Sequence, residues 1–156
     1  MISLDRAIVL ETAGPPPSDT TVTFTAGTSR IIVLRHGPPE NIVFARVSFA
    51  PATFPDSGQS VTVDIRPRPG VYGLELTSSV PFREGVTVEF DYARYFSAPA
   101  LALKVYSNEA AFARALAVGR LLPNNQIELL PTVSGELDHA AAAIAVPGSY
   151  LVAAPL

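Results

Sequence analysis

The sequence predicts an all-β protein, an antiparallel β-sandwich of about nine or ten strands, and three observations support this fold class. Polar and apolar residues alternate in several short segments, which is typical of strands with one buried face. The 15 prolines and 10 glycines interrupt the chain at many points, so that turns separate the segments. The length of 156 residues suits one domain with a single core. Short strands between frequent turns favour a sandwich or a barrel.

The individual strands follow from local patterns. Alternation is strict over residues 21–25, 60–65 and 86–92, so the apolar side chains of each segment share one face. The run Ile31–Leu34 is continuously apolar, which predicts a strand covered on both faces. Further strands are expected at residues 41–49, 71–76, 101–106, 126–130 and 149–153.

One segment has two interpretations. Residues 108–117 are rich in good helix formers, and Ser107 or Asn108 suits the N-cap of a short helix. The alternative is a hairpin in which residues 114–122 form a strand. In either case we expect one domain over residues 1–156, in which residues 1–20 form a lead strand and a proline-rich turn that can be loosely attached.

Composition excludes several classes of function. The net charge is −3 and Lys104 is the only lysine, whereas nucleic-acid binding requires clustered cations. The absence of cysteine removes disulfides, thiolate nucleophiles and cysteine-based zinc sites. No apolar run approaches the ~20 residues that span a bilayer, so no transmembrane segment is expected. The first residues have neither the basic region nor the long apolar region of a signal peptide.

The residues that catalysis or metal binding would use are sparse. His36 and His139 are expected in exposed turns, and neither has a second ligand at a suitable spacing. Glu75, Glu89 and Asp91 are expected on neighbouring strands, where they form a solvated polar face rather than an acid–base pair. We therefore predict a non-enzymatic protein with no catalytic residue, no metal and no cofactor.

Two segments are candidates for binding a partner. Arg94, Tyr95 and Phe96 follow a predicted strand, and tyrosine and arginine are favoured at interface hot spots. The alternative for this segment is that it lines the core as the end of a strand. Arg66 and Arg68 alternate with prolines in a stiff basic turn, which is either a plain loop or a site for an anionic group. Only 16% of residues are charged, where about 25% is usual, so some apolar surface is expected to meet a partner.

From Val47 onward the order of features resembles a known module. A strand entering a proline turn at 47–56 precedes an alternating strand at 61–65, and a pair of strands follows at 70–76 and 86–92. The ending, over 101–106, 127–133 and 147–153, contains a final Ser-Tyr-containing strand. This order is similar to that of the ZU5-type, immunoglobulin-like β-sandwich modules of bacterial surface and secreted proteins. Alanine and threonine at 52 and 53 replace the usual Gly-Ala, and the family's tryptophan is absent.

The resemblance implies a structural or protein-binding unit without catalytic residues. We therefore predict a non-enzymatic β-sandwich module of a bacterial envelope or extracellular assembly, located outside the cytoplasm, with another protein as its partner. Arginine, alanine and proline in place of lysine also favour a bacterial source. One alternative is a carbohydrate-binding module, which would bind a glycan on an exposed aromatic row. Another is an accessory subunit docked on a membrane protein complex through an edge strand such as Ile2–Leu10.

Overall fold

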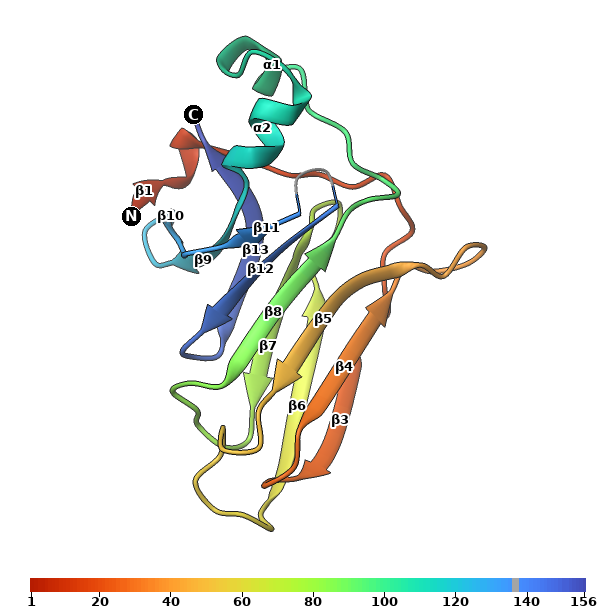
Figure 1. The fold of residues 1–156 in the computed structure, drawn as a ribbon, viewed down its shortest axis with the longest axis vertical. Coiled ribbons are helices and arrows are strands. Elements are labelled where there is room, and N and C mark those ends of the chain that lie inside the picture. The colour runs from red at the N-terminus through yellow and green to blue at the C-terminus, as the bar shows by residue number, and fades with distance from the viewer. Residues whose placement is uncertain (136–137) are drawn as a thin grey trace.

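Two antiparallel β-sheets pack face to face in the computed structural model, which describes residues 1–135 and 138–156 (Figure 1). This arrangement confirms the predicted all-β antiparallel sandwich. The described residues form 13 strands, more than predicted, because several short pairings of two to four residues add to the longer ones. Three short helical segments accompany them, namely η1 (Leu4–Arg6), α1 (Ala102–Val105) and α2 (Glu109–Ala115).

The larger sheet has eight strands and the smaller sheet has five. In spatial order the larger sheet contains β1 (Ile2–Ser3), β10 (Gln126–Leu129), β9 (Ala117–Leu122), β13 (Gly148–Pro155), β7 (Gly73–Ser78), β6 (Ser60–Pro67) and β3 (Thr20–Thr25), with β2 (Ala7–Val9) beside β13. The smaller sheet contains β11 (Val133–Ser134), β12 (His139–Ile144), β8 (Val86–Asp91), β5 (Val43–Phe49) and β4 (Arg30–Arg35). The strands β3 and β4 are therefore the edges of the two sheets on the same side of the sandwich (Figure 1).

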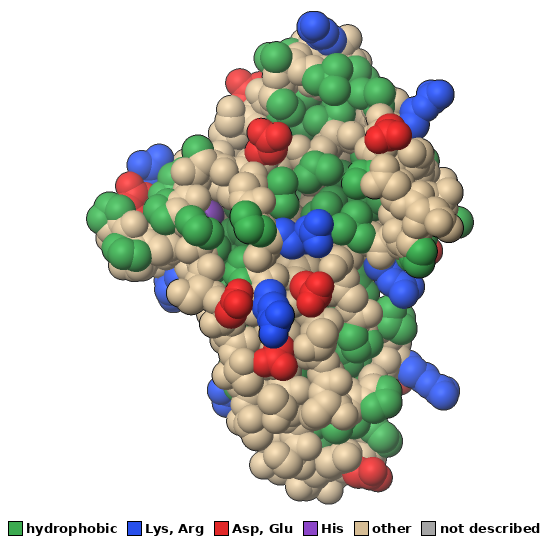
Figure 2. Space-filling view, turned by 180° about the vertical axis from the view of Figure 1, so that it is seen from behind, with side chains coloured by type: hydrophobic (Ala, Val, Ile, Leu, Met, Phe, Trp, Pro, Cys, Tyr) green, Lys and Arg blue, Asp and Glu red, His purple; other side chains and the backbone are tan. Residues whose placement is uncertain are grey.

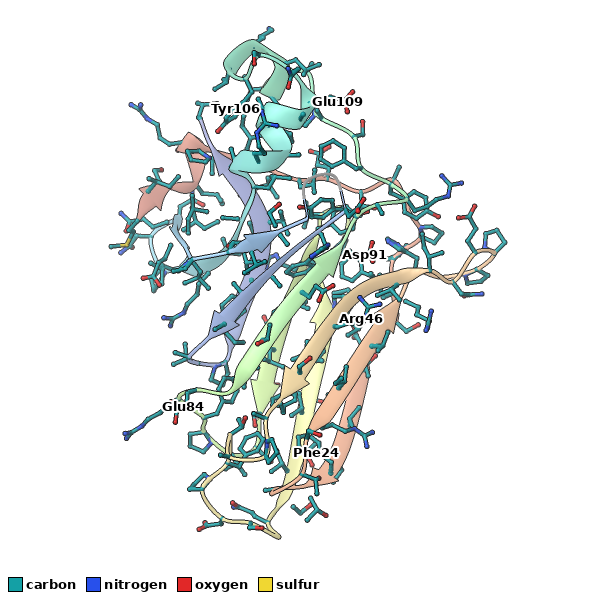
Figure 3. The ribbon with its side chains drawn as sticks, viewed as in Figure 1. Phe24, Arg46, Glu84, Asp91, Tyr106 and Glu109 are labelled. Carbon is teal, nitrogen blue, oxygen red and sulfur yellow. The ribbon has the colours of Figure 1, made fainter. Side chains whose placement is uncertain are left out.

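The core lies between the sheets and follows the alternation of the sequence. Val61, Val63 and Ile65 on β6 are fully buried, and Val88 and Phe90 on β8 face them across the sandwich. Near the lower end in Figure 3 the core is aromatic, where Phe24 packs with its ring centroid 5.5 Å from that of Phe49 and 6.0 Å from that of Phe54. Tilted and edge-on contacts of this kind contribute roughly 0.5–1.5 kcal/mol beyond area burial.

The C-terminal strand β13 lies in the middle of the larger sheet. It pairs with β9 through residues 150–153 on one side. On the other side it pairs with β7 through residues 148–151 and with β2 through residues 153–155. On the outer face of this strand, Leu151 and Ala153 join Ile127 in a small second core, which the first residues of the chain cover.

The segment at 108–122 contains both of the structures that the sequence leaves open. Residues Glu109–Ala115 form α2, and the Asn108 side chain accepts a hydrogen bond of 2.8 Å from the backbone N–H of Ala111. This is an N-cap, which satisfies one of the free amides of the first turn. The chain then continues as β9, so the helix is followed by the strand rather than replaced by it.

One strand prediction is wrong, and a second is correct as a strand but wrong about its burial. Residues 101–106 were expected to be a strand, but Ala102–Val105 form α1, whose first three residues, alanine, leucine and lysine, are good helix formers. The apolar alternation there reflects side chains that remain exposed at Leu101, Leu103 and Val105. The run Ile31–Leu34 is a strand, but it is not covered on both faces, because a two-layer sandwich has no third layer to cover the outside of β4.

Candidate binding groove

A groove of ≈ 530 Å³ lies on the outer face of the larger sheet, where the N-terminal segment passes the end of β6. Its apolar lining includes Leu4, Val9, Val71 and Leu151, which come from widely separated parts of the chain. Its charged lining consists of Arg66, Arg68 and Glu75. Figure 2 views this face of the molecule and shows charged side chains of both signs near the middle, with apolar side chains between and above them.

The local sequence explains how the two arginines reach the groove. Arg66 lies on the outer face of β6, and Arg68 follows two residues later, so both side chains emerge on the same side. A Cβ atom at Gly73 would lie 3.1 Å from Leu151 Cβ and 3.2 Å from Arg68 Cδ. The missing side chain at position 73 therefore allows the aliphatic stem of Arg68 to lie over the sheet.

The two arginines of the groove differ from Arg46 and Arg94 in their electrostatic surroundings. Within residues 1–135 and 138–156 the structure contains two ion pairs, Arg46–Glu89 and Arg94–Glu40. Arg66 and Arg68 take part in neither of them, although Arg66 is the register partner of Glu75 across β6 and β7. Their guanidinium donors thus remain available to a carboxylate from outside the chain.

The second predicted segment, residues 94–96, lies elsewhere and makes contacts within the chain. Arg94 donates two hydrogen bonds of 2.9 Å to the carboxylate of Glu40, and these bonds raise the pKa of the Arg94 guanidinium. Tyr95 packs with its ring centroid 4.8 Å from that of His36. Phe96 is half-buried and packs against the core. This segment attaches the 37–42 loop to the sandwich, and the structure does not bring it together with Arg66 and Arg68.

The expectation that His36 is exposed is wrong, because its side chain is 1% exposed. Its Nδ1 lies 2.9 Å from the carbonyl oxygen of Pro15, so Nδ1 carries the proton and donates. A Cβ atom at Gly14 would lie 2.7 Å from the same nitrogen, and only glycine leaves room for the ring there. His36 Nε2 has no hydrogen-bond partner among the described residues. The burial of His36 depends on a loop that precedes it by about 20 residues, so the sequence around His36 does not predict it.

His139 is half-buried at the start of β12, where it is the register partner of Asp91. The part of the predicted hairpin turn at residues 136 and 137 lies outside the described residues. Over the described ranges the structure shows no group of three or more His, Asp or Glu side chains that is placed to hold a metal ion.

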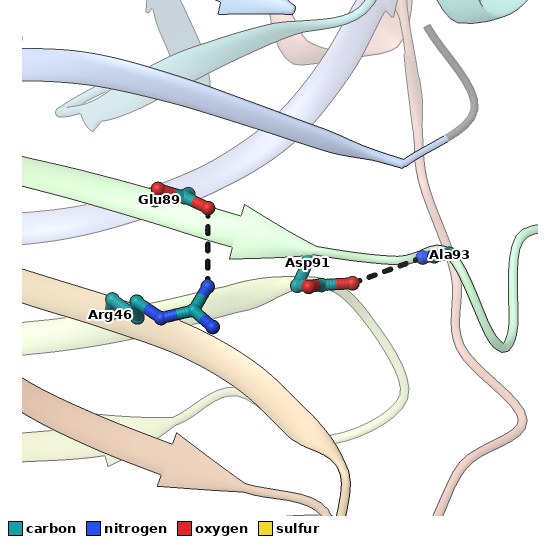
Figure 4. Close-up of polar contacts among 4 residues, drawn as sticks. All are labelled: Arg46, Glu89, Asp91 and Ala93. Carbon is teal, nitrogen blue, oxygen red and sulfur yellow. Dashed lines mark hydrogen bonds and ion pairs between the residues drawn. The ribbon is translucent and has the colours of Figure 1, made fainter. Parts of the chain in front are cut away.

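The predicted carboxylate face is confirmed in part and corrected in part. Glu89 and Asp91 lie on the outer face of β8, as alternation predicts. Glu89 accepts a hydrogen bond of 3.2 Å from Arg46, and Asp91 accepts one of 3.2 Å from the backbone N–H of Ala93 (Figure 4). Glu75 was expected on a neighbouring strand of the same face, but it lies on β7 in the other sheet. The strands β7 and β8 are consecutive in sequence but belong to different sheets, so Glu75 does not share a face with Glu89 and Asp91.

Comparisons with known proteins add no relative. No family model matches the chain, and neither a curated protein nor a solved structure matches it. The resemblance to ZU5-type modules therefore stays a prediction. None of the described helices has the length and apolar character needed to cross a membrane.

Proposed function

We propose that this chain is a non-enzymatic, protein-binding β-sandwich module of a bacterial envelope or extracellular assembly, and that the groove beside Arg66 and Arg68 receives the partner. The observation that supports this most directly is the combination of an apolar lining with two arginines outside any ion pair of the described residues. Arginine and apolar side chains together are favoured at protein interfaces.

The lining of the groove indicates what its partner presents. Leu4, Val9 and Leu151 offer apolar contact, and Arg66 and Arg68 offer donors that match a carboxylate. The partner segment therefore carries an apolar side chain next to a carboxylate, either an acidic residue or a chain terminus. Glu75 at the same groove disfavours partners with a second acidic group, because like charges at short range repel.

The alternative of a carbohydrate-binding module finds less support. Such a module stacks sugar rings on exposed aromatic side chains, and the large hydrophobic residues that are strongly exposed in the described part of the chain include no aromatic residue. Tyr95, Phe96 and Tyr106 are half-buried and pack against the core. In the alternative docking segment, Ile2–Leu10, β2 pairs with β13, and β1 offers a free edge of only two residues.

The proposal is tested with N-acetyl-leucine, which combines an apolar side chain with a carboxylate, and with N-acetyl-leucinamide, which lacks the charge. In a nuclear magnetic resonance titration of the full chain we expect the acid to shift amide signals around Val9, Val71 and Leu151, and the amide to bind more weakly. The double variant Arg66→Ala, Arg68→Ala is expected to bind the acid about tenfold more weakly, which corresponds to ~1.4 kcal/mol.

The matched control is Arg114→Ala, which removes an exposed arginine from α2. We expect this variant to titrate like the parent chain. If N-acetyl-leucine shifts no signal at the groove, or if the acid and the amide bind equally to parent and double variant, the groove is not the binding site and the proposal fails.

A further inference from the structure

The strand β4 is one of the two edges of the smaller sheet, and it is longer than the two-residue edge strand β11. It has six residues, Arg30–Arg35, and pairs with β5 alone. An edge strand presents a row of free N–H and C=O groups, which is a template for pairing with another chain. This surface is separate from the groove beside Arg66 and Arg68.

The hydrogen bonds around β4 define which backbone groups are free. The N–H of His36 donates to the carbonyl oxygen of Ile42 at 2.8 Å, so residue 36 faces β5. Backbone groups alternate in direction along a strand, so those of Ile32 and Leu34 also face β5. Those of Ile31, Val33 and Arg35 therefore point away from the sheet, and no other described residue is hydrogen-bonded to them.

The side chains on this edge are apolar in the middle and basic at the ends. Ile31 is 60% exposed and Val33 is 39% exposed on the outer face of the sheet. Arg30 and Arg35 flank them, both are exposed, and neither belongs to the two ion pairs of the described residues. Arg35 does donate a hydrogen bond of 3.3 Å to the carbonyl oxygen of Asn41.

Space is present beside the C-terminal half of this edge. A cavity of ≈ 320 Å³ lies between Pro17, Ser18 and Thr20 on one side and the segment Val33–Gly37 on the other. A strand that pairs with β4 can place the side chain of one end residue in this cavity. Proline at position 17 has no N–H, so it leaves the approaching strand no competing donor there.

The charges on β4 distinguish between two occupants. A second copy of this chain would bring its own Arg30 and Arg35 to the interface, so that four arginines gather with no acidic residue on either strand. Like charges close together are destabilising in paired strands. A segment with acidic residues at its ends instead meets an opposite charge at each end of β4.

We propose that β4 binds an extended segment of a different polypeptide, with acidic residues at both ends and apolar residues between them, by adding it to the smaller sheet as a further strand. Backbone hydrogen bonds to Ile31, Val33 and Arg35 provide the binding energy, as in other cases of strand addition. Apolar contact with Ile31 and Val33 and charge pairing with Arg30 and Arg35 provide the selectivity.

Hydrogen exchange of the full chain tests the proposal with two synthetic peptides. The first is acetyl-Glu-Val-Thr-Val-Thr-Val-Glu-amide, and the second has lysine in place of both glutamates. At ten times its dissociation constant, the first peptide is expected to slow exchange at the amides of Ile31, Val33 and Arg35 about tenfold. The lysine peptide is expected to leave them unchanged, and Ile32, which already faces β5, serves as the internal reference.

Charge-reversal variants identify the source of the selectivity. The variant Arg30→Glu, Arg35→Glu is expected to reverse the preference, so that the lysine peptide protects the edge. The matched control Arg83→Glu, Arg114→Glu makes the same change of net charge at exposed positions outside β4 and is expected to keep the original preference.

Three results would overturn the proposal. If neither peptide slows exchange at Ile31 and Val33, the edge of β4 does not accept a strand. Equal protection by both peptides would show that Arg30 and Arg35 select nothing. Protection that increases with protein concentration in the absence of peptide would identify a second copy of the chain as the occupant.

Discussion

The edges β3 and β4 lie on the same side of the sandwich, but the outward-facing side chains of β3 are polar and those in the middle of β4 are apolar. The outer face of β3 carries threonines, of which Thr21 donates a hydrogen bond to Asp64 and Thr23 is 3.0 Å from the hydroxyl of Thr62. The outer face of β4 carries Ile31 and Val33, which touch no covering layer. Both edges expose free backbone groups, so the difference lies in the side chains.

From this comparison we expect an exposed edge to accept a partner strand only when its side chains can be covered at little cost. On β3 the hydroxyls are engaged with the neighbouring strand β6, and a partner strand would find a polar, hydrated face. On β4 a partner strand would cover apolar surface, which is favourable at roughly 25 cal/mol per Å². Natural proteins protect most long edges with charge, and β4 has charge only at its two ends.

The largest change in unfolding free energy is expected from substitutions on β4, where it depends on the face that carries the side chain. Leu34→Ala removes a side chain that is 2% exposed in the core, which costs about 2–5 kcal/mol of unfolding free energy. Ile31→Ala on the outer face is expected to change the same quantity by less than about 1 kcal/mol, because the residue is largely hydrated already. Urea unfolding of both variants measures the difference. Equal losses would show that a cover for the outer face of β4 exists in solution.

The next test concerns the core that both edges share. Burial raises the pKa of Tyr72 and that of Tyr92 to about 12, from the ordinary value of 10.0. The folded state therefore favours the neutral phenols, and their contribution to stability is complete below pH 10 and is lost as the pH rises towards 12. Urea unfolding over this range, followed by tyrosinate absorbance, is expected to show stability that falls with pH. Tyr72→Phe is expected to make the fall shallower, and an unchanged slope would contradict this origin.

The smallest change in unfolding free energy is expected when the outer face of β3 is made apolar like that of β4. The variant Thr21→Val, Thr23→Val is expected to change the unfolding free energy by less than about 1 kcal/mol, because the lost hydrogen bonds are exposed. Its tendency to self-associate, measured by sedimentation velocity, is expected to rise. The reciprocal variant Ile31→Thr, Val33→Thr is the matched control and is expected to weaken binding of the acidic peptide. If neither variant alters association, side-chain polarity does not distinguish the two edges.

The sequence predicts where the strands lie better than it predicts which strands pair with one another. Alternation identifies β6 and β8 and assigns their inner faces correctly, because the pleat alone decides which way a side chain points. The same reasoning fails at Ile31–Leu34, since a continuous apolar run does not reveal that β4 is an edge. It fails at Glu75 for a related reason, because strands that follow each other in sequence can belong to different sheets.

The candidate groove could be predicted only in part. The alternation of Arg66 and Arg68 with prolines marks an exposed basic turn, and the structure places both arginines at the groove. Apart from Val71, the apolar side chains of the groove come from Leu4 and Val9, more than 50 positions away in the sequence, and from Leu151. Such a meeting of distant segments depends on sheet topology, which local patterns do not encode.

The central place of β13 has a consequence for biosynthesis. This strand emerges from the ribosome after every other described strand, yet β2, β7 and β9 all pair with it. The larger sheet consequently cannot close until residues 148–155 have emerged, and until then the earlier strands that pair with β13 have unpaired edges. Unpaired edges of this kind are prone to aggregation, so the interval before β13 emerges is the stage at which the nascent chain is most exposed to it.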